Sequence, residues 1–509
     1  MQPVYRIPEP FSGGLPPLPG AGISAAGKLR VLLVAHYLVD EPRAGTETYV
    51  ANLGKGLADL GIEVLYLAPA GPPSSSPQEP ISWRETRLLD QPLLQFSRVN
   101  HDLLATCRHP GFDAAFRNIL QHYQVDLIHF HHTYLSSISL LEVAVDFGLP
   151  VVLTLHDAWH LCPRLHCLND RGFCGGPEDL ERCTTCLEPM LKERTPETSR
   201  HLLTILTNRR QYVQSLFPRC QVLAPSRFLR NLHYRCGVAP GSIIHLPLGL
   251  DDLGPAAQFA PEDPPRFVFL GNIVPVKRVD IAIQAFAPLA GQTVLDIWGG
   301  LPQAQQKTLR ESLATYSHIR YRGPYRRGDL PKILAGATAL IICSDFENYP
   351  LVARESLSLG VPVIASGAGG LPEIVRHGEN GLLFPPGNVA ALREMVVQFL
   401  GPPDLRNRLR QGIRPVKTIG QEARELLSLY HSLTLRRSLA RRRTSPSPSQ
   451  TMIPEGAGDQ GKSETQEGLT EIIRQPWPPR PKKGLGVGLP GENSRRTPFE
   501  DQNPHITAG

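Results

Sequence analysis

The sequence has no run of about 18 or more apolar residues, so it predicts no membrane-spanning helix. It also lacks a secretory signal, because its first residues, MQPVYRIPEPFSGG, contain no apolar segment. We therefore expect a cytoplasmic protein, with peripheral contact at the inner face of the membrane as an alternative. The basic stretch 436–443 could touch anionic lipid, although most charge runs of this kind are simply solvated.

Net charge is also small, because 53 Lys and Arg residues face 47 Asp and Glu residues and leave +6 over 509 residues. Proteins that bind nucleic acid usually concentrate far more basic charge on one face, so composition argues against a nucleic-acid partner. Apolar residues make up 41% of the chain, which is enough to bury a core.

Proline is abundant, with 50 residues, and is concentrated at the two ends: residues 1–28 hold six and residues 437–509 hold ten. We expect disordered tails at 1–27 and 437–509. The second tail contains GAGDQGKS at 456–463, a literal Walker A pattern, and a literal G-x-G-x-x-G at 486–491. Neither follows a strand, so we do not expect a phosphate site there. A nucleotide-hydrolysing tail module is a remote hypothesis.

Between the tails, the order strand, loop, helix, strand occurs twice within about 35 residues, which is typical of a βαβ unit. The first copy begins with the apolar run 29–37 and the second with 266–273. Further apolar runs extend each half. The sequence therefore predicts an α/β fold with two doubly wound, Rossmann-like domains at 28–235 and 250–415 that face a central cleft. A helix at 420–436 follows.

Two glutamates have the strongest functional spacing. Glu347 follows a predicted strand, and Glu355 lies early in the next predicted helix, so both can reach the carboxyl edge of the sheet. The alternative is two solvated surface acids. A glycine-rich turn, SGAGGLPE at 366–373, could bind an anion with its backbone N–H groups or be merely a tight turn. Lys277, on the first loop of the same domain, could reach a diphosphate.

Together these stretches resemble the retaining, nucleotide-sugar-dependent glycosyltransferases of the GT-B fold, specifically glycosyltransferase family 4. The resemblance spans about residues 29–436. It rests on several motifs in order along the chain: AGTE at 44–47, LHD at 155–157, PSRF at 225–228, PLGLD at 247–251, Gly271 with PVK at 275–277, the Glu347/Glu355 pair, and GGLPE at 369–373.

The resemblance implies a hexosyltransferase (EC 2.4) that moves a sugar from a nucleotide-diphosphate sugar to a glycan or lipid-linked acceptor, in polysaccharide or glycoconjugate biosynthesis. It implies that Glu347 and His156 are catalytic, with Glu347 at the transferred sugar and His156 at the sugar or acceptor. It implies that Glu355 binds the ribose. The implied donor-binding residues are Gly45, Thr46, Asn272, Lys277, Arg278, Glu355, Gly369 and Gly370.

The chain contains no Asp-x-Asp, which fits a family that neutralises the diphosphate without a metal cofactor. Two positions depart from the family pattern: Asn272 stands where an arginine is usual, and, as a milder change, Asn348 replaces a frequent glycine. Either Arg278 or another base compensates for Asn272, or the enzyme is slow, or the protein does not catalyse. The alternative function is therefore a glycosyltransferase-like binding or regulatory protein without turnover.

Five of the nine cysteines fall within 162–186, in an insertion at 160–187 that follows the LHD motif. A similar cysteine-rich insertion occurs in some related glycosyltransferases. Clustered thiols in a reducing compartment indicate a metal more than disulfides. We expect a structural zinc ion, with an iron–sulfur cluster or free thiols as alternatives and Cys167 and His166 as alternate ligands. The expected ligands are Cys162, Cys174, Cys183 and Cys186.

Overall fold

The computed structural model of the chain describes residues 28–38, 45–73, 83–98, 107–169, 172–188, 195–255, 263–301 and 303–444. The predicted tail at 1–27 and the Walker A stretch at 456–463 lie outside these residues. Within them, no helix is long and apolar enough to cross a membrane.

The first domain is built on an eight-stranded sheet with the order β10-β9-β6-β5-β1-β2-β4-β3. Only β3 is antiparallel to its neighbour. The strand at 221–224, β9, is internal, because β10 pairs on its outer side. The strands are β1 (Arg30–Val34), β2 (Glu63–Pro73), β3 (Trp83–Leu88), β4 (Gln91–Arg98), β5 (Leu127–Phe130), β6 (Val151–Thr154), β9 (Gln221–Ala224) and β10 (Ile243–His245).

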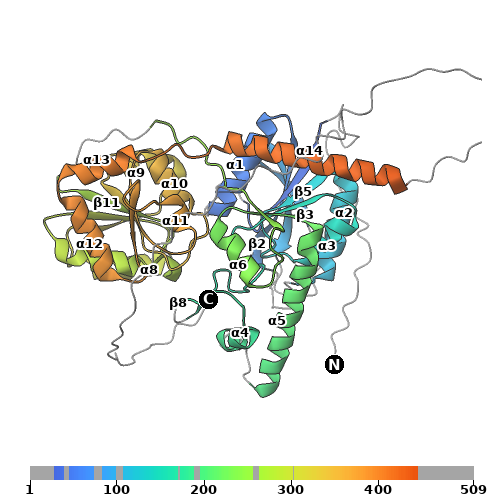
Figure 1. Cartoon of the computed structure of the whole chain (residues 1–509), viewed down its shortest axis with the longest axis horizontal. Coiled ribbons are helices and arrows are strands. Elements are labelled where there is room, and N and C mark those ends of the chain that lie inside the picture. Colours follow the sequence, from blue (N-terminus) through green and yellow to red (C-terminus); the bar gives the residue numbers. More distant parts are fainter. Residues whose placement is uncertain are drawn as a thin grey trace, which may run out of the picture. The chain divides into compact units, whose positions relative to one another are not determined.

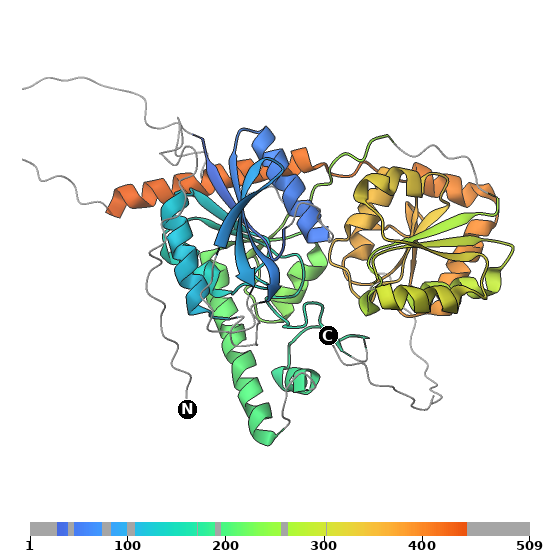
Figure 2. The same ribbon diagram turned by 180° about the vertical axis from the view of Figure 1, so that it is seen from behind.

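Helices cover both faces of this sheet (Figures 1 and 2). Alternate residues of β1 explain the two layers, because Leu32 and Val34 pack on one face while Val31 and Leu33 pack on the other. One layer includes α2 (Pro110–Tyr123), α3 (Ser139–Asp146), α5 (Pro196–Leu216) and α6 (Arg227–Arg235). The other contains α1 (Gly45–Asp59) and α14 (Ile419–Thr444).

The second domain has a six-stranded, fully parallel sheet with the order β13-β12-β11-β14-β15-β16. Its strands are β11 (Arg266–Leu270), β12 (Val294–Trp298), β13 (Ile319–Gly323), β14 (Ala339–Ile342), β15 (Val363–Ser366) and β16 (Gly381–Phe384). Its helices are α7 (Val279–Phe286), α8 (Gln303–Leu313), α9 (Leu330–Leu334), α10 (Leu351–Ser358), α11 (Leu371–Ile374), α12 (Val389–Leu400) and α13 (Pro403–Gln411). The two predicted Rossmann-like sheets are therefore present.

The last helix is longer than predicted. We expected it to end at Arg436 and a tail to begin at 437, but α14 continues to Thr444. The added residues, RSLARRRT, contain no glycine or proline, and arginine, alanine and leucine are strong helix formers. α14 follows the second domain in sequence but packs beside α1 of the first, where Ala423, Leu426 and Tyr430 are buried (Figures 1 and 2).

The cysteine-rich insertion has structure that the sequence did not predict. A short antiparallel hairpin pairs β7 (Leu168–Asn169) with β8 (Gly172–Phe173), and helix α4 (Leu180–Leu187) follows. The Asp179 side chain accepts the N–H of Glu181 at 2.9 Å and so caps the start of α4.

Candidate active site

Glu347 is held in place by two side chains beyond the carboxyl end of β14. Lys277 Nζ lies 2.5 Å from Glu347 Oε1, and Ser344 Oγ donates to the same oxygen at 2.7 Å. Only 8% of Glu347 is exposed. The structure thus brings together the predicted sugar carboxylate and the predicted diphosphate lysine, which are 70 residues apart in sequence.

Glu355 lies in α10 and is 3% exposed. Arg327 Nε donates to Glu355 Oε1 at 2.6 Å, and Arg327 Nη1 pairs with Asp251. Burial raises the pKa of Glu355, and the Arg327 guanidinium opposes that rise. The third nitrogen, Arg327 Nη2, is buried without a hydrogen-bond partner among the described residues. Sequence reasoning missed Arg327, because nothing local marks it.

The glycine-rich turn lies directly against the loop that carries Glu347. A Cβ on Gly369, whose φ is +60°, would stand 1.9 Å from the Glu347 carbonyl oxygen, and one on Gly370 would stand 1.9 Å from the Asn348 oxygen. Only glycine fits such approaches. The Gly370 N–H donates to the Glu347 carbonyl at 2.8 Å, so this amide is already used inside the protein.

Asn348 joins this loop to residues of the first domain. Its Nδ2 donates to the carbonyls of Leu155 at 3.1 Å and His156 at 2.9 Å, while its Oδ1 accepts from Ser226 Oγ. Glu373 makes a second connection, accepting the N–H groups of Arg227 at 2.9 Å and Phe228 at 2.7 Å at the start of α6. Four of the predicted landmark segments therefore meet: 155–157, 225–228, 347–355 and 369–373.

His156 belongs to a cluster of histidines that the sequence analysis did not recognise. Its Nε2 lies 3.1 Å from His131 Nδ1, and its ring centroid lies 5.3 Å from that of Tyr49. Burial lowers the pKa of His156 to about 3, so the ring is neutral near pH 7. The signal was the pattern HFHH at 129–132, directly at the end of β5.

A second pair lies beside this cluster. His132 Nε2 is 3.0 Å from Asp157 Oδ2, and the Trp159 N–H donates to Asp157 Oδ1 at 2.8 Å. Burial would raise the pKa of Asp157, but these two contacts outweigh it and lower the pKa below its usual range. The carboxylate is therefore ionised at neutral pH.

The remaining predicted donor-binding residues differ in how they are placed. Gly45 and Thr46 begin α1, and a Cβ on Gly45 would meet Leu351 at an ordinary 3.7 Å, so nothing there requires glycine. Asn272 follows β11, and its Oδ1 would lie 2.9 Å from a Cβ at Gly300. Arg278 donates to Asp280 at 3.0 Å and to Asp345 at 3.2 Å, so two carboxylates already neutralise it.

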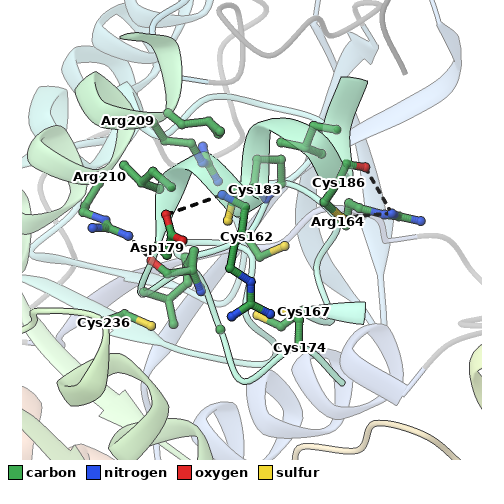
Figure 3. A pocket seen from close by; sticks show the side chains of 18 of the residues that line it. Cys162, Arg164, Cys167, Cys174, Asp179, Cys183, Cys186, Arg209, Arg210 and Cys236 are labelled. Atoms are coloured by element: carbon green, nitrogen blue, oxygen red, sulfur yellow. Dashed lines mark hydrogen bonds between the residues drawn. The ribbon is translucent and has the colours of Figure 1, made fainter. Parts of the chain in front are cut away.

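The four predicted metal ligands line one cavity, together with Cys167 and Cys236 (Figure 3). His166 lies elsewhere, with its ring 5.4 Å from that of Phe346. In the described part of the chain, no three or more His, Cys, Asp or Glu side chains are arranged to hold a metal ion.

Two family models match the chain. The model described as Glycosyltransferase Family 4 matches residues 43–252, and the one described as Glycosyl transferases group 1 matches residues 254–415. Together they cover most of both α/β domains.

Curated relatives agree with these matches. A D-inositol 3-phosphate glycosyltransferase of Streptomyces scabiei is 30% identical over 199 residues, which are 35% of this chain and 44% of that protein. An N-acetyl-alpha-D-glucosaminyl L-malate synthase of Bacillus anthracis is 24% identical over 169 residues, or 33% of this chain and 44% of that protein. The chain thus spans less than half the length of these relatives.

Solved structures share the fold. Sucrose-phosphate synthase from Thermosynechococcus elongatus matches with a TM-score of 0.54 at 19% identity, over 82% of this chain and 99% of that one. The catalytic domain of starch synthase IV from Arabidopsis thaliana, bound to ADP and acarbose, matches with a TM-score of 0.53 at 16% identity, over 81% and 100%. These likenesses confirm the predicted two-domain α/β architecture.

Proposed function

The chain belongs to glycosyltransferase family 4 and has the GT-B fold, and from this premise we propose that it transfers a sugar from a nucleotide-diphosphate sugar to an acceptor hydroxyl. We propose that the anomeric configuration is retained and that the acceptor is a glycan or lipid-linked molecule of glycoconjugate biosynthesis. The proposed location is the cytoplasm, and the alternative is peripheral contact with the inner face of the membrane.

One observation carries this function: two buried carboxylates, Glu347 and Glu355, each hold a cation at the carboxyl end of one parallel sheet. Ligands of open α/β sheets bind at this edge. A carboxylate such as Glu355 can accept hydrogen bonds from both ribose hydroxyls. Lys277 brings a positive charge next to Glu347, where the sugar and diphosphate of a bound donor would meet.

In the proposed reaction, the bond between the anomeric carbon and the diphosphate oxygen breaks. The acceptor oxygen then forms its bond on the same face of that carbon, and the acceptor proton passes to the departing diphosphate. Negative charge grows on the leaving group, so a preplaced cation stabilises the transition state more than the ground state. Lys277 is the residue placed to do this, with Glu347 fixing its ammonium group.

On the acceptor side, the proposal assigns hydrogen-bonding roles to the histidine cluster. Because burial keeps the His156 ring neutral, it can donate through one nitrogen and accept through the other, but it supplies no charge. Asp157 is an ionised carboxylate in this region. One of its oxygens lies within hydrogen-bond distance of His132 Nε2, and the other accepts the Trp159 N–H. His156 therefore fits a role in orienting a sugar or acceptor hydroxyl.

A second candidate function is a binding protein without turnover. It is favoured by Asn272, an uncharged side chain where the related sequences usually have arginine, and by Arg278, whose guanidinium is paired with Asp280 and Asp345. Under this candidate the donor would bind, but too little positive charge would meet the departing diphosphate.

The experiment that separates the two functions uses the full chain and a panel of UDP-, ADP-, GDP- and dTDP-sugars. Thermal shift identifies which donor binds, and release of the free nucleoside diphosphate into water reports turnover without an acceptor. We expect one nucleotide class to stabilise the protein and to be hydrolysed slowly. Binding without release, with or without added acceptors, would favour the second candidate, and no binding by any donor would overturn both.

A further inference from the structure

The insertion at 160–187 has too little apolar surface to hold itself in place. On α4 only Leu187 is buried, where it packs against Leu202 and Leu206 of α5. The hairpin of β7 and β8 has two residues in each strand. Segments this small usually need a cross-link or a metal. Three regions of the insertion carry cysteines: the turn before the hairpin, the residue that directly follows its second strand, and α4 (Figure 3).

Three of the sulfur atoms accept hydrogen bonds from N–H donors. Cys162 accepts from the backbone N–H groups of Arg164 and Cys167, and Cys174 accepts from that of Gly176. Cys186 Sγ accepts from Arg164 Nη1 at 3.2 Å (Figure 3). Donors aimed at sulfur stabilise thiolates, and metal-bound thiolates keep such donors around them.

Cys183 and Cys186 are three residues apart in α4, so their side chains lie on the same helix face. Cys183 is close enough to interact electrostatically with the three thiols just described, those of Cys162, Cys174 and Cys186. Cys167 differs from these four. It is 1% exposed, and its thiol is hydrogen-bonded to those of Cys162 and Cys174.

We propose that this insertion is a structural zinc site with four thiolate ligands: Cys162, Cys174, Cys183 and Cys186. A tetrahedral set of four cysteine ligands is a common arrangement for structural zinc, with Zn–S distances of about 2.3 Å. The described residues do not yet form such a set. The ion must therefore draw α4 together with Cys162 and Cys174, which lie on either side of the already paired hairpin, and each thiol that binds the ion gives up a proton.

The charges around the cavity fit this occupant. Zinc with four thiolates carries a net charge of −2, which needs positive neighbours. Four arginines line the cavity, and among the described residues that line it the one acidic side chain, Asp179, is occupied in capping α4. These arginines are Arg164, Arg182, Arg209 and Arg210.

The position of the insertion links the zinc site to the proposed active site. The ring of Phe173, in β8, lies 6.0 Å from that of Phe346, the residue before Glu347. The ring of His166 contacts the same phenylalanine. A metal that orders the hairpin would thereby order the surroundings of Glu347. The ion itself takes no part in the reaction.

The test begins with the full chain purified without chelators. We expect elemental analysis to find about one zinc per chain. Replacement by cobalt(II) should give the thiolate charge-transfer band in the near ultraviolet and the strong visible bands of a tetrahedral site. Zinc well below stoichiometric, together with five reactive thiols, would overturn the proposal, as would disulfides detected by mass spectrometry or iron with acid-labile sulfide.

Matched variants then test the ligand set. Cys183→Ser and Cys186→Ser should each weaken zinc binding about tenfold or more, whereas Cys167→Ala, Cys220→Ser and Cys343→Ser should retain the cobalt spectrum. Loss of the spectrum in Cys167→Ala with retention in Cys186→Ser would refute the assignment. Nucleotide-induced thermal shift shows that each variant is folded. For the unmodified chain, the number of reactive thiols with and without a chelator gives an independent readout, because thiols bound to zinc should react only after the chelator removes the ion.

Discussion

Lys277 and Glu347 form a close charged contact at the centre of the candidate site, with 2.5 Å between Nζ and Oε1. The ammonium of Lys277 is only partly buried, with 28% of its side chain exposed, whereas 10% of the Glu347 side chain is exposed. A partly open cation fixed by a buried carboxylate is suited to meet an incoming anion. In the proposed complex, the diphosphate would approach Lys277 from the side of its ammonium group that Glu347 leaves open.

Lys277→Ala should lower turnover strongly, by about 10²- to 10³-fold, because it removes charge stabilisation that grows in the transition state. Arg278→Ala is the matched control. Its guanidinium is held by Asp280 and Asp345, so we expect a much smaller loss. Steady-state hydrolysis of the bound donor measures both. Equal losses in the two variants would show that Arg278, not Lys277 alone, meets the diphosphate.

The two glutamates should separate binding from turnover. Glu355→Gln should weaken nucleotide affinity, because a contact to the ribose acts in the ground state and the transition state alike. It also leaves Arg327, with its buried Nη2, facing an uncharged partner. Glu347→Gln should mainly lower kcat, since contacts at the reacting sugar strengthen in the transition state. Calorimetry with the nucleoside diphosphate and donor kinetics measure the two effects; equal loss of nucleotide affinity would contradict these roles.

What the sequence could predict here is local. Glu347 and Glu355 belong to one strand–loop–helix segment, so their spacing alone places both at the sheet edge. The glycines at 369 and 370 were expected to bind an anion or to form a tight turn, and the structure shows in addition that they pack closely on residues 347 and 348. That packing depends on two loops meeting in space, which one loop's sequence cannot reveal.

Contacts between distant segments were missed for the same reason. Asn348 and the Leu155 carbonyl are 193 residues apart, and Arg327 and Asp251 are 76 apart. No periodicity or spacing connects such partners. The histidines at 129–132 are a different case, because HFHH at the end of a buried strand was visible as an unusual polar run. Polar residues at the end of a buried strand indicate a candidate site in the same way as the two glutamates do.

The end of α14 gives a prediction about the chain that follows it. Truncation after Thr444 should leave melting temperature and turnover nearly unchanged, because the removed sequence has no periodic apolar face with which to offset its ordering entropy. Truncation after Arg436 should lower the melting temperature slightly, since it removes the contact of Arg437 with the Asp126 carbonyl at 3.4 Å. Scanning calorimetry compares them. Loss of activity after the first truncation would implicate the Walker A stretch.

Acid should destabilise the protein through its buried histidines. Burial lowers the pKa of His36, His129 and His156 to about 3, against 6.5 for the unfolded chain. Between these values the unfolded state binds the extra protons, so stability falls as pH drops below about 6.5. At pH 5 the loss is at most about 2 kcal/mol for each histidine. Glu422, whose pKa burial raises to about 7, acts in the opposite direction and offsets part of it.

Urea unfolding at pH 7.5 and pH 5 measures this loss. His36→Asn should flatten the dependence, because it removes one depressed pKa while breaking few contacts; the nearest carboxylate oxygen, on Glu47, is 4.0 Å away. His201→Asn, at an exposed position, should leave the slope unchanged. A protein whose stability rises on acidification would show that Glu422 outweighs the histidines.

Asn348 should act as a positioning residue for His156. Its amide donates to the carbonyls of Leu155 and His156 and accepts from Ser226, and it is 7% exposed. Asn348→Ala removes the donor from the buried Leu155 carbonyl, at a cost of about 1–3 kcal/mol, and from the partly buried His156 carbonyl, at a smaller cost. Because these bonds hold the backbone of His156 beside the loop of Glu347, the variant should lose kcat. The affinity for the nucleoside diphosphate, whose ribose we propose to be bound by Glu355, should stay close to that of the unmodified chain.

Ser226→Ala is the control for Asn348→Ala, since it removes the bond to Oδ1 and the cap on the Leu229 N–H at the start of α6 but leaves both carbonyl contacts in place. It should retain most of the turnover. Asn348→Asp, which has no N–H to donate and adds a buried charge, should be more damaging than alanine. Single-turnover kinetics with the bound donor, beside calorimetric nucleotide binding, distinguish lost positioning from a general loss of folding. If Asn348→Ala weakened nucleotide binding and left turnover of the bound donor intact, the bridge would serve the donor pocket instead of His156.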